Sequence, residues 1–268
     1  MGAQAEMKGI AAGRFRRRQF GRGHAYYLDG EKLDGVTTML GDGVRKKALE
    51  EWAGNVTADY AVDHWDELAQ MPFSQRLATL KKARYEVRDA AARRGTEVHR
   101  LAELTVQGDE VAVPDELAGH VESAVRFMDE WQVEHIVTEA SCCNIDERLG
   151  GTLDLIFRSP LFPGRVFLAD WKTSKDIYGE VAFQLECYGR SDFYLDADGN
   201  EQSMAALGIT DHVAIHIRSD GYTVYPMERG EQVWRIAKTI IQNARNTRDS
   251  DRIRSLRGDA MYLPGVAA

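Results

Sequence analysis

The sequence has no run of the roughly 18 to 20 consecutive apolar residues that a membrane span needs. Residues 1–19 contain no apolar segment of the kind a secretory signal requires, so we expect neither feature. Cysteine is scarce, with 3 in 268 residues, and no two have CxxC spacing. This small, odd number argues against a disulfide framework and against a cysteine-ligated zinc or iron site. A reducing, cytoplasmic compartment is the simplest expectation.

Basic residues are fewer than acidic ones: the chain has 34 Lys and Arg and 42 Asp and Glu, which gives a net charge of -8. This balance opposes long-range attraction to nucleic acid, although a local basic patch could still bind it. Five arginines without an acid lie in residues 14–22, and five more lie in residues 245–257. Taken alone, each cluster is better explained as a solvated face or a mobile arm than as a binding site.

Three common catalytic motifs are missing. The chain has no GxxxxGK[ST] phosphate loop, which argues against an ATP-driven motor. It has no GxSxG nucleophile motif and no HExxH zinc motif, so neither hydrolase class has support from the sequence.

Hydrophobic periodicity predicts an α/β fold with a mixed central β-sheet flanked by helices and an N-terminal helical extension. Residues 1–23 are expected to be a poorly ordered basic arm. The expected helices cover residues 45–70, 74–107, a segment from 114, 177–195 and a last segment around 233–241. The expected strands cover residues 135–145, 150–158 and 165–173, with hairpins over 24–40 and 212–228.

These elements predict one domain over residues 1–268. Its N-terminal part, residues 1–89, would hold the basic arm, a hairpin and the helical extension. Residues 90–245 would form the core, and residues 246–268 a basic C-terminal tail.

The most informative stretch is residues 150–175, where charged residues interrupt two apolar strands. Because strand side chains alternate, Asp170 and Lys172 should share one face of their strand. By the same alternation, Thr152, Asp154 and Ile156 should share a face of the preceding strand.

A tight connection at residues 159–164 would pair these two strands. Counting inward places Asp154 beside Ala169 and Asp170, within one residue. Burying two like charges is costly unless a cation neutralises them, and a divalent metal together with Lys172 would do so. An ordinary salt bridge between strands is the alternative, and for a bare D…DxK pattern it is the commoner explanation.

Hard oxygen ligands of this kind suit Mg²⁺ or Mn²⁺. Such an ion can polarise a phosphoryl oxygen and lower the pKa of a bound water. Lys172 could then orient that water or stabilise developing charge. The pattern therefore fits hydrolysis of a phosphodiester.

Four motifs in this order resemble the RecB-like branch of the PD-(D/E)xK nuclease superfamily, over about residues 90–195. They are a GxxxH helix at Gly95–His99, a GxxD strand at Gly151–Asp154, a (D/E)xK strand at Asp170–Lys172 and a QxxxY helix at Gln184–Tyr188. The early VTTML followed by LEEWA is similar to phage-encoded members described as CRISPR-associated-type exonucleases.

The resemblance implies a role for each matching residue. His99, Asp154 and Asp170 would be metal ligands, with the backbone carbonyl of Trp171 as a further one. Lys172 would be the catalytic lysine.

Gln184 and Tyr188, which face the same way on a helix, would hold the phosphate or the lysine beside the site. A buried polar pair that satisfies backbone groups is the alternative for these two. Glu139 matches a position where relatives often carry Glu, so it would be a further ligand or support one. Some relatives also hold an iron-sulfur cluster on cysteines near the C-terminus, but here the last one is Cys187, which we expect in the core. No such cluster is expected.

The function that the resemblance implies is a Mg²⁺- or Mn²⁺-dependent deoxyribonuclease, an exonuclease rather than an endonuclease, in recombination, repair or phage replication. DNA would be its partner, together with a single-strand annealing or recombination protein, in the host cytoplasm if a phage encodes it. One alternative is a non-catalytic DNA-binding or interaction protein on a nuclease scaffold, against which the intact Asp154, Asp170 and Lys172 argue. Another is a carboxylate-based hydrolase with a non-nucleic substrate, which no motif supports.

Overall fold

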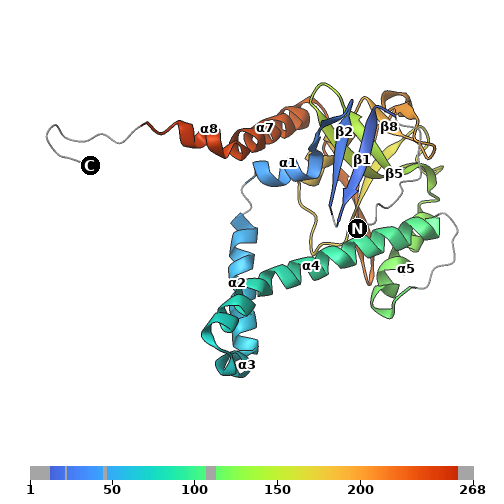
Figure 1. The fold of residues 1–268 in the computed structure, drawn as a ribbon. Helices are drawn as coiled ribbons and strands as arrows, with labels where there is room; N and C mark the ends of the chain where they lie inside the picture. Colours follow the sequence, from blue (N-terminus) through green and yellow to red (C-terminus); the bar gives the residue numbers. More distant parts are fainter. Residues whose placement is uncertain (1–12, 22, 45–46, 107–112, 259–268) are drawn as a thin grey trace, which may run out of the picture.

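The computed structural model describes residues 13–21, 23–44, 47–106 and 113–258. It confirms the predicted α/β class, with a mixed central sheet flanked by helices (Figure 1). Strand order is β11-β10-β7-β6-β5-β8-β9, with β4 beside β6, and the β7–β10 pair is parallel whereas its neighbours are antiparallel. The strands are β4 (Asp34–Gly35), β5 (Glu134–Asn144), β6 (Leu149–Arg158), β7 (Phe167–Lys172), β8 (Phe193–Leu195), β9 (Glu201–Ser203), β10 (Asp211–Arg218) and β11 (Gly221–Met227).

Helices cover both faces of this sheet. On one face α1, α6 and α7 enclose a core that includes Leu168, Leu185 and Ile241. On the other, α4 and α5 enclose a core that includes Phe127 and Phe157. The helices are α1 (Val36–Gly43), α2 (Lys47–Asp63), α3 (Trp65–Gln70), α4 (Phe73–Val106), α5 (Asp115–Glu130), α6 (Val181–Gly189), α7 (Glu231–Arg248) and α8 (Ser250–Ser255), with a 3-10 turn at Ala205–Leu207.

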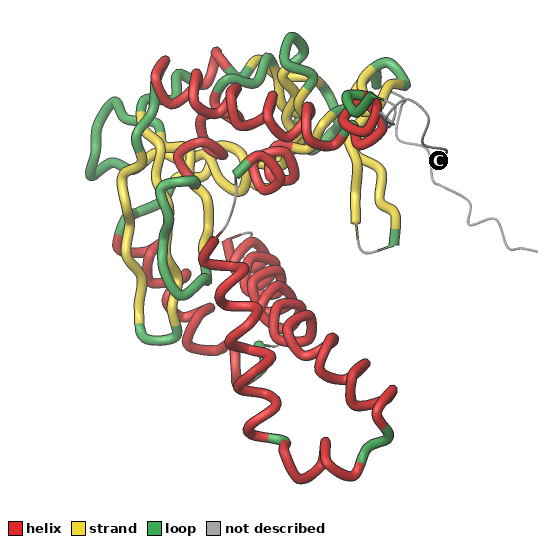
Figure 2. Tube along the Cα trace, turned by 90° about the vertical axis from the view of Figure 1, so that its left-hand side faces the viewer, coloured by secondary structure: helices red, strands yellow, loops and turns green. Residues whose placement is uncertain are grey.

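Three helices form an arm that extends away from the sheet. Figure 1 shows α2 running outward from near α1 to α3 at the far end of this arm, where α4 begins. Figure 2 shows the same arm from the side. α4 then continues to the sheet, so the boundary expected at residue 90 falls inside one helix. The boundary expected after residue 245 likewise falls inside α7. Among the described residues, no helix combines the length and apolar content that a membrane span requires.

The N-terminal segment contains more structure than its composition suggested. β1 (Phe15–Phe20), β2 (Gly23–Leu28) and β3 (Glu31–Lys32) form a three-stranded antiparallel sheet, so the prediction of a poorly ordered arm is wrong for residues 15–20. Phe15, only 2% exposed, anchors β1 in an apolar cluster with Tyr26 of β2. The part of the arm before residue 13 lies outside the described residues.

The predicted hairpin is half right. β2 and β3 pair across Asp29 and Gly30, whose φ values of 51° and 85° suit a two-residue type I′ turn. The following VTTML, predicted as a strand, is instead helix α1. Its Met39 is fully buried against α7, and this packing overrides the β preference of the β-branched residues.

Two other predictions of helices need correction. Within the segment predicted at 45–70, the described residues 47–70 form two helices that meet at His64. The segment 177–195 is helical only in α6. Residues 193–195 form β8, because Phe193 pairs with Cys143 of β5. Cys142, Cys143 and Cys187 are all buried free thiols, as expected for Cys187.

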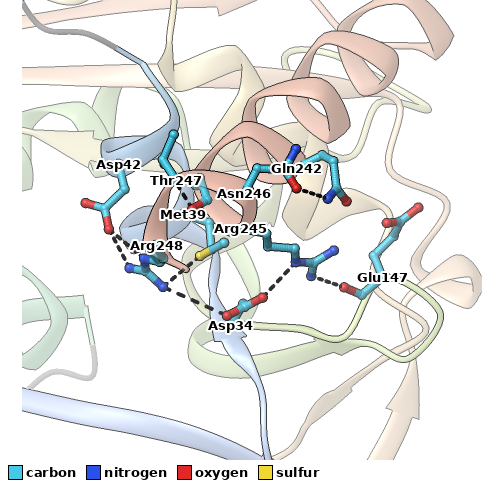
Figure 3. A network of polar contacts seen from close by, with 10 residues as sticks. Asp34, Met39, Asp42, Glu147, Gln242, Arg245, Asn246, Thr247 and Arg248 are labelled. Carbon is cyan, nitrogen blue, oxygen red and sulfur yellow. Dashed lines mark hydrogen bonds and ion pairs between the residues drawn. The ribbon is translucent and has the colours of Figure 1, made fainter. Parts of the chain in front are cut away.

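Arginines at the end of α7 hold the helix against the sheet and α1 (Figure 3). Arg245 donates to Asp34 Oδ2 at 2.8 Å and to the Glu147 carbonyl at 2.6 Å. Arg248 donates to Asp42 Oδ2 at 2.8 Å. These two members of the C-terminal basic cluster therefore contribute to the fold.

Candidate active site

Strands β5 and β6 lose regular alternation at one level of the sheet, where the register places Glu139 opposite Asp154. Leu153 packs in the core under α6 and α7, whereas Leu155 packs in the core under α4 and α5. In a regular strand these two side chains would share a face. Glu139 has φ 48°, a left-handed value that is unusual for a residue with a side chain. Both strands are therefore irregular where Asp154 emerges, although their register does not change there.

This irregularity makes one prediction wrong. Ile156 packs in the same core as Leu153, and Thr152, which neighbours Leu153, must point to the other side. Thr152 meets the Tyr26 hydroxyl of β2 at 2.8 Å. Thr152 and Ile156 therefore do not share a face, because the irregularity at Asp154 separates them.

The predicted convergence of Asp154 and Asp170 is present. β6 and β7 pair at Leu155 and Ala169, so continuing that register brings the two aspartates opposite each other. Main-chain pairing between these strands ends there. Beyond it, the Trp171 N–H donates to Asp154 Oδ2 at 2.9 Å, so the carboxylate takes the place of a backbone acceptor.

Gln184 of α6 joins the other predicted residues. Its Nε2 donates to Asp170 Oδ1 at 2.6 Å, and its Oε1 accepts from Lys172 Nζ at 3.5 Å. Lys172 also forms an ion pair with Asp170 Oδ2. The Tyr188 hydroxyl lies 3.3 Å from Gln184 Nε2. A side chain at Gly151 would overlap the ring of Tyr188. Glycine at that position lets α6 pack close enough for these contacts.

Negative charge dominates the site. Burial raises the pKa of Asp154 well above its usual value, and the charges of Asp170 and Glu139 raise it further. Lys172 opposes this shift, as does the N–H bond from the backbone. Asp170 is 1% exposed, and its Oδ2 has the lysine ion pair but no hydrogen bond. Carboxylates held this close favour a cation.

The donor set fits a hard divalent ion through the oxygens of Asp154 and Asp170. Among the described side chains, no group of three or more His, Cys, Asp or Glu is close enough to hold a metal. His99 lies on α4, but its side chain is not among those described. One turn earlier on α4, a Cβ at Gly95 would lie 3.2 Å from Thr173 Oγ1, so α4 passes close to the end of β7.

Residues around a pocket beside Lys172 were not found from the sequence. The pocket lies between α1, the β7–α6 loop, α6 and α7. Part of its wall is α1, which the sequence analysis assigned to a strand, so its contribution could not be anticipated. The sequence offered one signal, the aromatic residue Tyr178 next to Gly179.

The left-handed backbone at Glu139 reverses the usual order of stability of a glycine and an alanine variant. At φ 48° any residue with a Cβ is strained. The free energy of unfolding of Glu139→Gly should therefore be roughly 1 kcal/mol higher than that of Glu139→Ala. In a regular strand the alanine variant would be the more stable one. Urea denaturation of both variants measures the difference. If alanine proves more stable than glycine, the left-handed backbone at this position is wrong.

Comparisons with known proteins add little to this geometry. No family model and no curated protein matches the chain. Among solved structures, one titled "Crystal structure of SSO0001" is similar at 15% identity and a TM-score of 0.30. The match covers 60% of this chain and 72% of that one, and at this TM-score it carries no argument about fold or function.

Proposed function

We propose that the protein is a metal-dependent DNA nuclease that hydrolyses phosphodiester bonds, similar to RecB-like exonucleases of the PD-(D/E)xK superfamily. The observation that carries the proposal is the contact of Gln184 with both Asp170 and Lys172, with Asp154 in register opposite Asp170. Motifs from two strands and a helix thus meet at one point. A salt bridge for stability alone would not need the amide or the second carboxylate.

The proposed chemistry assigns a task to each group. Asp154 and Asp170 would hold Mg²⁺ or Mn²⁺, with His99 and the Trp171 carbonyl as further ligands. The ion would supply Lewis acidity and a more acidic bound water. Lys172, 27% exposed at its side chain, would stabilise charge on the phosphoryl group. The two contacts of the Gln184 amide would keep Lys172 and Asp170 in fixed positions relative to each other.

DNA as the substrate is supported by the hairpin of β1 and β2. Arg16, Arg17 and Arg18 are all exposed on β1. The hairpin lies against the strand that carries Asp154, because Tyr26 contacts Thr152. Exonuclease mode, a role in recombination, repair or phage replication, and an annealing or recombination protein as partner rest on the family resemblance.

The hairpin arginines give a prediction with an internal control. Arg16→Ala with Arg18→Ala should weaken DNA binding for all sequences and flatten its salt dependence, by about one unit of log–log slope per lost phosphate contact. Arg14→Ala should leave the slope unchanged, because Arg14 donates to Glu201 at 2.8 and 2.9 Å and is already paired. Fluorescence anisotropy across a salt series measures both. Equal slopes for wild type, the double variant and Arg14→Ala would mean that the hairpin does not contact phosphate.

The test of the proposal is incubation with labelled linear and circular DNA, with and without Mg²⁺ or Mn²⁺. Metal-dependent loss of linear DNA alone supports an exonuclease, and loss of both forms an endonuclease. Binding without cleavage supports the alternative of a non-catalytic DNA-binding protein. If the protein neither binds nor cleaves DNA, the remaining alternative is a hydrolase with a non-nucleic substrate.

A further inference from the structure

A pocket of about 250 Å³ opens beside Lys172 and Gln184. Its apolar wall includes Leu40 of α1, Phe183 of α6 and Ile240 of α7. Pockets for drug-sized ligands begin at roughly 300 Å³, so this one has room for a single ring system and not for a duplex. Whatever occupies it lies directly beside the proposed reaction centre.

The polar groups of the pocket oppose an anion. Asp176 and Glu180 both line it, and among the described lining residues Lys172 is the one cation. Lys172 is itself paired with Asp170. A phosphate inside would therefore meet two carboxylates, whereas the amino and ring N–H groups of a nucleobase would find acceptors there.

The loop between β7 and α6 is already ordered for binding. Ser174 Oγ donates to the Asp176 carbonyl at 2.7 Å, and the Asp176 carboxylate accepts the Ile177 N–H at 2.8 Å. The Ser174 carbonyl lies 2.7 Å from His216 Nε2 of β10. These contacts fix the part of the pocket wall that this loop forms, so little ordering is needed when a ligand enters.

Tyr178 stands on this loop with 59% of its surface exposed. A large aromatic ring exposed at the edge of a pocket is suited to stacking, and every base presents a π-face to such a ring. The aromatic ring, the apolar wall and the carboxylate acceptors all fit the same class of ligand.

We propose that this pocket binds one nucleobase of the DNA strand, that of the nucleotide next to the phosphate at Lys172, with Tyr178 stacked on it. The inference rests on the proposed nuclease function and deepens it, because it assigns the group that positions the strand end. The phosphate itself stays outside the pocket, at Lys172.

The test measures binding in EDTA, where no cleavage occurs. Single-stranded oligonucleotides carry 2-aminopurine at either the 5′ or the 3′ terminal nucleotide. One of these probes should be quenched on binding, and Tyr178→Ala should remove the quenching and weaken binding roughly tenfold. Tyr178→Phe should retain both, and Tyr85→Ala, which removes an exposed tyrosine of α4 outside the pocket, should leave the quenching unchanged.

An oligonucleotide without the terminal base gives a second measurement. It should bind wild type about as weakly as the intact strand binds Tyr178→Ala, and the two losses should not add. Quenching that persists in Tyr178→Ala, or additive losses, would overturn the base pocket. If DNA is cleaved in Mg²⁺ yet neither probe is quenched, this inference fails and the proposed function stands. Absence of any DNA binding would overturn both.

Discussion

Lys172→Ala should reduce DNA cleavage by roughly 100- to 1,000-fold while DNA binding stays close to that of wild type. The expected loss follows from the position of Nζ, which is held by Asp170 and by Gln184 Oε1. At the proposed phosphoryl site, such a fixed cation would contribute most when negative charge grows in the transition state. Cleavage is measured in Mg²⁺ or Mn²⁺, and binding in EDTA.

A matched control is available three residues along the chain. Lys175→Ala removes an exposed lysine from the loop that follows β7 and should leave cleavage unchanged. Equal losses in the two variants would indicate a general electrostatic effect on DNA binding. Thermal melting of both proteins establishes that they are folded.

The aspartates should behave differently from the lysine. Asp154→Ala and Asp170→Ala should abolish cleavage and also weaken metal binding, because the carboxylates are the proposed ligands. In EDTA, Asp154→Asn should be at least as stable as wild type, since burial and neighbouring charge already disfavour the ionised carboxylate. Residues that act as one unit are not additive, so the triple alanine variant should be no worse than the worst single one. Folded Lys172→Ala and Asp154→Ala proteins that still cut DNA at near wild-type rates would show that the site is assigned wrongly.

The meeting of Asp154, Asp170 and Lys172 could be predicted because it depends on local rules. A short connection fixes which residues of β6 and β7 oppose each other, within one position, and alternation along β7 puts Asp170 and Lys172 on one face. Helical spacing places Gln184 and Tyr188 on one face in the same way. These relations need no knowledge of the rest of the chain.

The left-handed backbone at Glu139 and the helical state of α1 could not be predicted in this way. The left-handed φ of Glu139 results from how β5 and β6 fit between two different cores, and no residue type in EASCCN marks it. α1 is helical because Met39 packs against α7, about 200 residues later in the sequence. Contacts at such distances decide between states that local preference leaves close in energy.

Which arginines are paired with acids also could not be predicted from the local sequence. Composition treats Arg14 and Arg245 like the other arginines of their clusters. Their acidic partners lie 187 and 211 residues away, at Glu201 and Asp34. Only the fold separates these paired arginines from the exposed Arg16 to Arg18.

The stability of the protein should fall as pH drops from about 7 to 4, with His212 of β10 as one identifiable cause. This residue is 3% exposed, and burial lowers its pKa from 6.5 to about 4. Glu186, whose Oε2 lies 3.8 Å from His212 Nδ1, opposes the shift without cancelling it. The folded protein therefore keeps the imidazole neutral at pH values where the unfolded chain has protonated it.

The direction and size of the effect follow from proton linkage. Between pH 6.5 and 4 the unfolded state binds one more proton at this residue, so the free energy of unfolding decreases as pH falls. At about 1.4 kcal/mol per pKa unit, the contribution of His212 is fully present above pH 6.5 and about 3 kcal/mol smaller at pH 4.

His212→Gln isolates this contribution, because glutamine does not titrate and all other groups are common to both proteins. At pH 7.5 the variant should be the less stable of the two, since it replaces a packed ring. The difference in unfolding free energy should then shrink by about 3 kcal/mol towards pH 4, measured by urea denaturation at each pH. A difference that stays constant from pH 7.5 to 4 would mean that His212 titrates alike in the folded and unfolded states, and that its burial against Glu186 does not exclude the charged ring.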